Sequence, residues 1–291
     1  MKFVSPRNDV AFKKIFGDEN RKGILISFLN AVLDLQGDRE IEDLEILNPY
    51  QAPRVAELKY SLLDVRARDK RGITFIVEMQ VEYVAGYEKR FLYYSSKAYV
   101  SQIDRAVDYP RLNQVIFIGI LDFKAFTGKD YLTRHLILNT KTGRQEIKDL
   151  EFNFIELPKF KKVEAELETL LDKWIYFLKH AEDLEVIPQN VDNVALRDAY
   201  EVANRFGWTK AEMELYDYWD IQAQDARGAV EAAEAKGWQE GRQEGRQEGR
   251  QESQQAIART MLAEGLDPAT VAKFTGLPIE EIDRLDADLP A

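Results

Sequence analysis

The sequence predicts an α/β protein with a helical C-terminal extension, and three observations indicate this. Residues 1–155 mix the 3.6-residue period of amphipathic helices with the two-residue alternation of strands. Residues 156–235 carry apolar side chains three and four positions apart, which is typical of helices that pack along one face. A four-residue repeat, 236–255, and an apolar-patterned tail, 256–291, follow. We expect the helical extension to pack on or beside the sheet.

The composition excludes several classes of site. The 291-residue chain has no cysteine, which excludes disulfide scaffolds, thiolate metal sites and cysteine nucleophiles. Its only histidines are His135 and His180, which argues against a multi-histidine metal site and a Ser–His–Asp triad. Hydrolytic chemistry in this chain would therefore depend on carboxylates, amides, lysines and a hard metal ion.

The charge distribution favours a polyanionic partner for the first half of the chain. The net charge of −11 divides into +3 over residues 1–150 and −14 over residues 151–291. The N-terminus lacks the apolar segment of a signal peptide, and the longest apolar run, Val115–Leu121, is too short to span a membrane. We expect a cytoplasmic protein without membrane segments.

The segment Tyr60–Tyr83 predicts two strands joined by a charged turn. By the two-residue period, Leu63 and Val65 share one face of the first strand, and Asp64 lies on the other. On the second strand, Phe75 and Val77 fall on one face, and Ile76, Glu78 and Gln80 fall on the other. The pattern therefore places the side chains of Asp64, Glu78 and Gln80 on one surface of a hairpin.

Two carboxylates on adjacent strands suit Mg²⁺, which prefers hard oxygen ligands and often combines one or two carboxylates with substrate phosphate oxygens. Such an ion can polarise a phosphate and supply bound hydroxide. The alternative is that both carboxylates are solvated on the open face of a sheet. An unpaired charge within an apolar strand is costly, but solvated carboxylates are common on open sheets, so the residues alone leave both interpretations open.

Several motifs in order along the chain resemble one family. They are SPRNDVAFKKIFG, the helical RKGILISFLNAVL, LEILNP and LLDVRARDKRGITFIVEMQ, followed by Arg90 and Tyr94. Over about residues 3–125 the chain resembles the recombination-promoting nuclease and transposase family of the PD-(D/E)xK nuclease superfamily. The resemblance implies a restriction-endonuclease-like mixed sheet flanked by helices in residues 1–155.

The resemblance also implies roles for individual residues. Asp64 and Glu78 match the acidic positions of the superfamily motif, and Gln80 stands where many members have lysine. The backbone carbonyl of Met79 would be a further metal ligand, and Asp9 is the candidate for an extra acidic ligand. The remaining candidates are Glu57 as the alternative acidic ligand and Lys13, Lys59, Arg90 and Lys97 as phosphate contacts.

The expected function is hydrolysis of DNA phosphodiester bonds by a Mg²⁺-dependent endonuclease of low sequence specificity, with Mn²⁺ as an alternative ion. The resemblance links this activity with DNA recombination, mobile elements or phage defence. Gln80 cannot act as a general base because an amide does not titrate, but it can orient a water. Two alternatives remain: a pseudo-nuclease that acts as an interaction or regulatory protein, and a nuclease directed at RNA.

The C-terminal segments predict self-association. The repeat GRQE places glycines four residues apart, and each glycine costs a helix about 1 kcal/mol relative to alanine. The repeat is therefore expected to form a linker or a long helix that can associate with a second copy. The tail has helix–turn–helix punctuation, with Asp267-Pro268 as a cap and Thr275-Gly276 as a stop. Because Glu280 and other acidic residues follow, we interpret the tail as a small helical hairpin for packing or for forming a homodimer or higher oligomer, and not as a reader of DNA bases.

Overall fold

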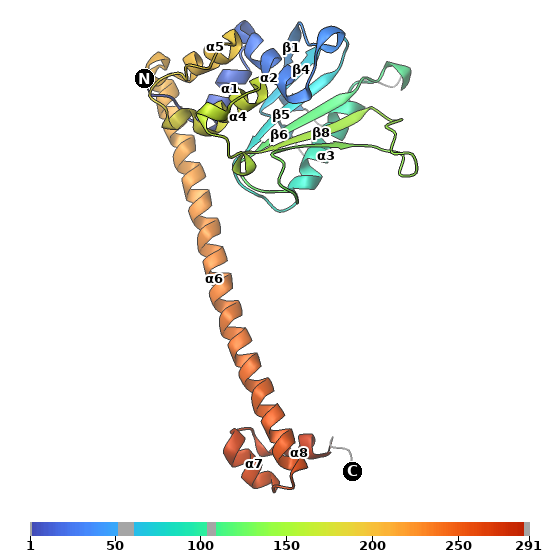
Figure 1. Ribbon diagram of the computed structural model, residues 1–291, viewed down its shortest axis with the longest axis vertical. Coiled ribbons are helices and arrows are strands. Elements are labelled where there is room, and N and C mark those ends of the chain that lie inside the picture. Colours follow the sequence, from blue (N-terminus) through green and yellow to red (C-terminus); the bar gives the residue numbers. More distant parts are fainter. Residues whose placement is uncertain (1, 52–60, 104–108, 288–291) are drawn as a thin grey trace. The chain divides into compact units, whose positions relative to one another are not determined.

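The computed structural model describes residues 2–51, 61–103 and 109–287. The chain divides after Ala223 into two compact units. Figure 1 shows the first unit as an open sheet with helices on both faces. Its helices are α1 (Asp9–Phe16), α2 (Gly23–Leu33), α3 (Tyr87–Val100), α4 (Leu170–His180) and α5 (Val194–Ala203), and α6 (Lys210–Ala263) begins within it.

The main sheet has six strands in the order β1-β4-β5-β6-β8-β7. Strands β5, β6 and β8 are parallel, and the outer pairings are antiparallel. The central strand β6 is VIFIGIL, and it is buried along its whole length, as expected for a strand that is covered on both faces. The strands are β1 (Leu44–Leu47), β4 (Val65–Asp69), β5 (Thr74–Gln80), β6 (Val115–Leu121), β7 (Leu132–Leu136) and β8 (Leu150–Glu156). A short separate pair joins β2 (Tyr50–Gln51) to β3 (Ser61–Leu62).

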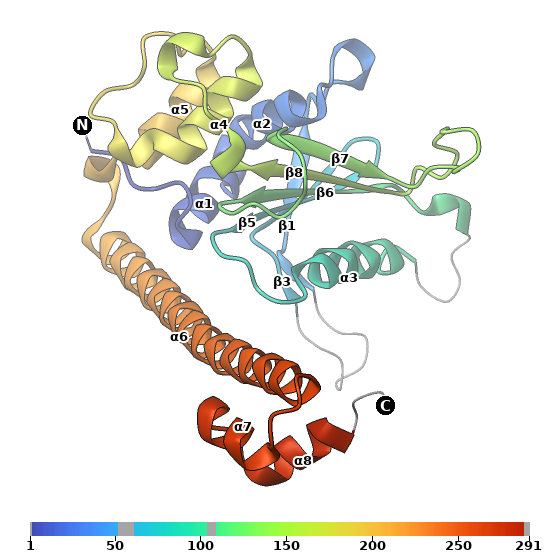
Figure 2. The same ribbon diagram turned by 60° about the horizontal axis from the view of Figure 1, so that its bottom comes forward.

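Each face of the sheet is covered by its own hydrophobic core. Phe75 and Val77 of β5 belong to the larger core, to which α1, α2, α4 and α5 contribute. Ile76 belongs to the smaller core, in which Tyr87 and Ala98 of α3 pack against the sheet. Figure 2 shows α3 along one side of the sheet and α2 and α4 on the other. The alternation predicted for β5 is confirmed, and it divides the residues of this strand between the two layers.

The N-terminal segment is held by residues far along the chain. The backbone N–H of Val4 donates to the carbonyl of Ala203 at 2.9 Å, and the N–H of Ser5 donates to the Tyr216 hydroxyl at 3.0 Å. The Asn8 side-chain amide donates to the carbonyl of Tyr216 at 3.2 Å. These contacts fix the approach of the chain to α1, and therefore α1 depends on residues beyond α5 for its position.

The second unit contains the remainder of α6 together with α7 (Pro268–Thr275) and α8 (Ile279–Ala287). The repeat lies within α6, and all its residues from 237 to 253 are exposed. The tail has a small core of its own, formed by Ala258, Leu262, Val271, Leu277, Ile282 and Leu285. In the described part of the chain, every helix is too short or too polar to traverse a lipid bilayer.

Candidate active site

Asp64 lies at a bend that separates β3 from β4. Leu63 packs in the core beneath α3, whereas Val65 packs in the core on the opposite face. The prediction that Leu63 and Val65 share a face is therefore wrong, because the bend interrupts the two-residue period at Asp64. Asp64 comes directly before Val65, the first paired residue of β4, so its carboxylate lies at the end of the β4–β5 pairing and not on one face of the sheet.

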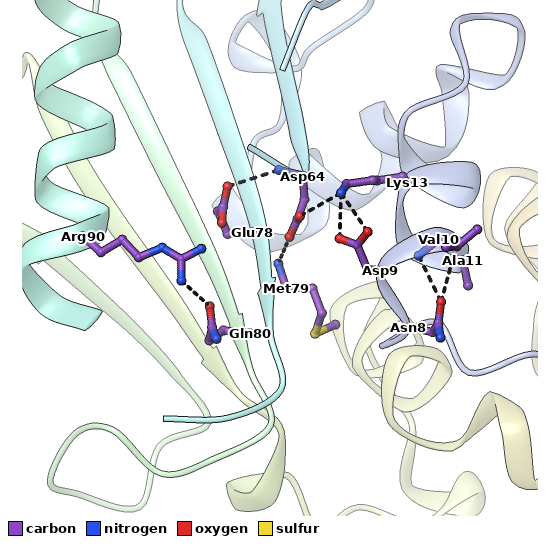
Figure 3. A network of polar contacts seen from close by, with 10 residues as sticks. All are labelled: Asn8, Asp9, Val10, Ala11, Lys13, Asp64, Glu78, Met79, Gln80 and Arg90. Carbon is purple, nitrogen blue, oxygen red and sulfur yellow. Dashed lines mark hydrogen bonds and ion pairs between the residues drawn. The ribbon is translucent and has the colours of Figure 1, made fainter. Parts of the chain in front are cut away.

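Asp64 and Glu78 are linked by two hydrogen bonds that cross between neighbouring strands. The last paired residues, Val65 and Val77, set the register that brings Asp64 opposite Glu78. The backbone N–H of Met79 donates to Oδ2 of Asp64 at 2.8 Å, and the N–H of Asp64 donates to Oε1 of Glu78 at 3.2 Å. Figure 3 shows the two carboxylates next to each other. Each carboxylate is held by the backbone of the other strand.

Both carboxyl groups are largely shielded from water, and burial raises the pKa of each. Glu78 is only 5% exposed, and the side chain of Asp64 is 14% exposed. Burial, together with the nearby Asp9 charge, raises the pKa of Asp64 to about 6, although the Met79 hydrogen bond and Lys13 act in the opposite direction. Burial and the charge of Asp64 raise the pKa of Glu78 well above its usual range. The pair therefore lacks enough nearby positive charge to be fully ionised at low cost.

Helix α1 brings Asp9 and Lys13 to one side of this pair. The Asn8 side chain caps the helix by accepting the N–H groups of Val10 and Ala11, so that α1 begins at Asp9. The Lys13 ammonium lies 2.7 Å from Oδ1 of Asp9 and 3.7 Å from Oδ1 of Asp64. Burial lowers the pKa of Lys13, but the two aspartates outweigh it and the net pKa is raised. Lys13 is therefore a cation bound within the site.

Helix α3 brings Arg90 to the other side. Its Nη1 donates to Oε1 of Gln80 at 3.4 Å, and its Nε donates to the Tyr94 hydroxyl at 2.8 Å. Burial lowers the pKa of Arg90, whereas the Tyr94 hydrogen bond and the charges of Glu78 and Asp64 raise it. Gln80 also donates to the carbonyl of Glu82 at 3.1 Å, so both ends of its amide are engaged.

Lys97, another predicted phosphate contact, is not part of this cluster. Lys97 lies two turns along α3 from Arg90, with its ammonium 5.9 Å from the centre of the Tyr93 ring. Lys59 and Glu57 lie outside the described residues. The structure therefore brings together Asp9, Lys13, Asp64, Glu78, Met79, Gln80 and Arg90 of the predicted set.

The donor chemistry of Asp64 and Glu78 fits a hard divalent cation. Among residues 2–51, 61–103 and 109–287, no group of three or more histidine, cysteine, aspartate or glutamate side chains is arranged as a metal site. Mg²⁺ needs fewer protein ligands than that, because it retains waters and takes substrate phosphate oxygens. Two neighbouring buried carboxylates with raised pKa values are an environment that an added positive charge would stabilise.

We expect the metal-free protein to lose stability as the pH rises. The pKa of Asp64 is about 6 in the folded chain, above its ordinary value of 3.8, so between these values the folded state holds a proton that the unfolded state releases. The contribution is present below pH 4 and is lost as the pH rises through about 6, and Glu78 extends the loss upward. Chemical denaturation in EDTA at a series of pH values from 4 to 8 will measure this. The free energy of unfolding of Asp64→Asn, minus that of wild type, should increase as the pH rises. A difference that stays constant with pH would contradict the prediction.

The comparisons with known proteins agree with this geometry. Residues 6–233 match the family model described as PD-(D/E)XK nuclease family transposase. The chain belongs to this family. Residues 251–286 match a second model, described as the Rpn/YhgA-like nuclease family, C-terminal HTH domain. No curated protein and no solved structure matches the chain significantly. The restriction-endonuclease-like fold inferred from the resemblance is confirmed, and the tail of this PD-(D/E)XK family member matches a helix–turn–helix domain model.

Proposed function

We propose that the chain is a metal-dependent endonuclease that hydrolyses DNA phosphodiester bonds with little sequence preference. Membership of the PD-(D/E)XK family supports nuclease activity. The observation that carries the finer proposal is the buried Asp64–Glu78 pair, held by reciprocal backbone hydrogen bonds and flanked by Lys13 and Arg90. A purely structural role would not require two carboxyl groups to share a buried site at the end of a ladder.

In this proposal one set of residues holds the metal ion and another contacts the phosphate. Asp64 and Glu78 hold Mg²⁺ or Mn²⁺ together with the carbonyl of Met79, and Asp9 is the candidate for a further ligand. A divalent cation bound there would polarise the scissile phosphate and lower the pKa of an attacking water. Arg90 and Lys13 partly compensate the negative charge of the two carboxylates. Once an ion is bound, both cations can contact phosphate oxygens.

The proposed substrate is DNA without strong sequence preference. The helix–turn–helix match supports DNA binding by the tail. Its last helix, α8, has the sequence IEEIDRLDA, with four acidic residues and a single arginine. A helix that reads bases in the major groove usually presents arginine, lysine, asparagine or glutamine, so α8 supports weak sequence discrimination. If phosphate contacts dominate, the affinity for DNA will fall steeply with salt concentration.

The test is a plasmid assay with Mg²⁺, with Mn²⁺ and with EDTA. Wild type is expected to nick supercoiled DNA with either ion, and both EDTA and Asp64→Ala should stop cleavage. Single-stranded DNA and single-stranded RNA are run in parallel. Cleavage of RNA alone would replace the proposal with an RNA-directed nuclease. Binding of DNA without cleavage by any ion would indicate a pseudo-nuclease.

Replacing Gln80 with lysine is expected to change both the cleavage rate and the pH profile. The amide accepts a hydrogen bond from Arg90, and a lysine would remove that acceptor and place a like charge beside the guanidinium. We expect a rate loss of about tenfold or more, as is usual for groups that orient a site. The matched control is Gln114→Lys, which lies beside Glu151. An unchanged rate and profile for Gln80→Lys would remove its positioning role.

The self-association inferred from the repeat and tail stays a prediction. Around Gly237, Gly241, Gly245 and Gly249, no atom of the described residues outside the local helix backbone lies within 4 Å of the place that a Cβ would take, so a second helix could approach closely there. Sedimentation of the full chain across a range of concentrations will measure it. A monomer at all concentrations would contradict the prediction.

A further inference from the structure

Tyr87 carries a buried hydroxyl that has no partner. It is the first residue of α3, its side chain is only 3% exposed, and its ring lies 5.6 Å from Phe91 and 5.8 Å from Phe123, between ring centroids. Among the described residues no hydrogen-bond acceptor or donor reaches its hydroxyl oxygen. Buried tyrosine hydroxyls usually find a partner, and a buried polar group without one destabilises the fold. The hydroxyl therefore needs an explanation.

Gly119 shows where the hydroxyl lies. A Cβ built on Gly119 would be 2.7 Å from the Tyr87 oxygen, so the absence of a side chain on β6 makes the space that the hydroxyl occupies. Gly119 is the register partner of Glu78 on the adjacent parallel strand. Neighbouring strands are about 4.8 Å apart, so the hydroxyl lies over the position next to Glu78.

Electrostatics agrees with this placement. Burial is the main cause of a strongly raised pKa at Tyr87, and the second cause is the charge of Glu78. Glu78 and Gly119 both point toward the α3 layer, since their neighbours Ile76, Phe117 and Leu121 belong to the core beneath α3. Oε1 of Glu78 already accepts the N–H of Asp64, and Oε2 is the oxygen left for another donor.

We propose that Tyr87 is a positioning residue whose hydroxyl donates a hydrogen bond to the Glu78 carboxylate and fixes its orientation toward the divalent cation. The inference rests on the proposed function, since it gives Glu78 a partner for its ionised form. A hydroxyl that is unpaired in the metal-free chain and paired in the metal-bound chain contributes to affinity for the ion rather than to folding. A tyrosine with only a structural role would contribute to folding stability and not to affinity for the ion.

The test is Tyr87→Phe, which removes only the hydroxyl. Calorimetric titration of Mn²⁺ into the DNA-free full chain should show an affinity about tenfold or more below wild type, the usual effect of losing a partner of a metal ligand. The thermal midpoint of the metal-free variant should stay unchanged or rise, because an unpaired buried hydroxyl has been removed. At saturating Mn²⁺, single-turnover cleavage should be slower while the affinity for DNA stays the same.

Tyr99→Phe is the matched control on the same helix. Its hydroxyl donates to Oδ1 of Asp149 at 2.8 Å, so this variant should lose stability and keep its Mn²⁺ affinity. Wild-type Mn²⁺ affinity in Tyr87→Phe, or a loss of affinity that comes with a lower thermal midpoint, would overturn the inference. If wild type binds Mn²⁺ and Asp64→Asn does not, the metal site stands whatever Tyr87→Phe shows. Absence of Mn²⁺ binding by wild type would overturn both proposals.

Discussion

Replacement of Asp64 by asparagine is expected to lower DNA cleavage by at least about 10³-fold. Asparagine has the same shape, and its amide oxygen can still accept the N–H of Met79. What the change removes is the charge with which Asp64 would hold a divalent cation. Loss of a metal ligand forfeits several kcal/mol of transition-state stabilisation, and each 1.36 kcal/mol is a factor of ten in rate. Plasmid nicking and single-turnover kinetics at saturating Mg²⁺ will measure it.

The same variant should be at least as stable as wild type without metal above pH 6. It no longer carries a carboxylate that burial disfavours. Asp69→Asn is the control, because Asp69 is also a buried aspartate of the same hairpin, 7% exposed and 2.7 Å from Nη2 of Arg71. That variant should lose stability and retain activity below its melting temperature. Near wild-type cleavage by Asp64→Asn would remove the proposed site.

Replacement of Gly119 by alanine is expected to destabilise the fold by about 1–3 kcal/mol, the usual cost of adding a methyl group to a packed core. The new Cβ would lie 2.7 Å from the Tyr87 oxygen and 2.8 Å from Cδ1 of Phe154. Both neighbours are buried aromatic side chains, so neither can move aside cheaply. Denaturant titration of the metal-free protein will measure the change in the free energy of unfolding.

Gly23→Ala is the control for that measurement. Gly23 begins α2, and beyond the local helix backbone no atom of the described residues lies within 4 Å of the place that its Cβ would take, so alanine should be neutral or slightly stabilising there. Combining Gly119→Ala with Tyr87→Phe should restore part of the lost stability, because the clash with the hydroxyl disappears and the clash with Phe154 stays. A Gly119→Ala protein as stable as wild type would show that the aromatic layer is loosely packed.

The sheet could be predicted from the sequence because its central strands are apolar and short. The two-residue period on β5 correctly divided Phe75 and Val77 from Ile76, since both faces of this strand are covered and every side chain must enter a core. The same period failed at Leu63. The bend cannot be recognised from the sequence, because Leu63 and Val65 on either side of it are both apolar and both buried, one in each core.

The assembly of the candidate site was less accessible to sequence reasoning. Asp9 and Lys13 are four residues apart on a helix, and that spacing alone indicates their ion pair. The approach of Lys13 to Asp64 depends on how α1 docks, and local patterns do not carry that information. The sequence did contain an indication that a group approaches β6 closely where the Tyr87 hydroxyl lies. This is the glycine of VIFIGIL, because an isolated glycine within a strand often marks such an approach.

The anchoring of the N-terminal segment has a consequence for biosynthesis. The chain before α1 is fastened to Ala203 and Tyr216, which the ribosome adds about two hundred residues after Asp9. The hairpin with its two acidic groups is translated much earlier than these anchors. The hydrogen bonds that hold the segment before α1 can therefore form only once Tyr216 has been synthesised, long after the hairpin that carries Asp64 and Glu78.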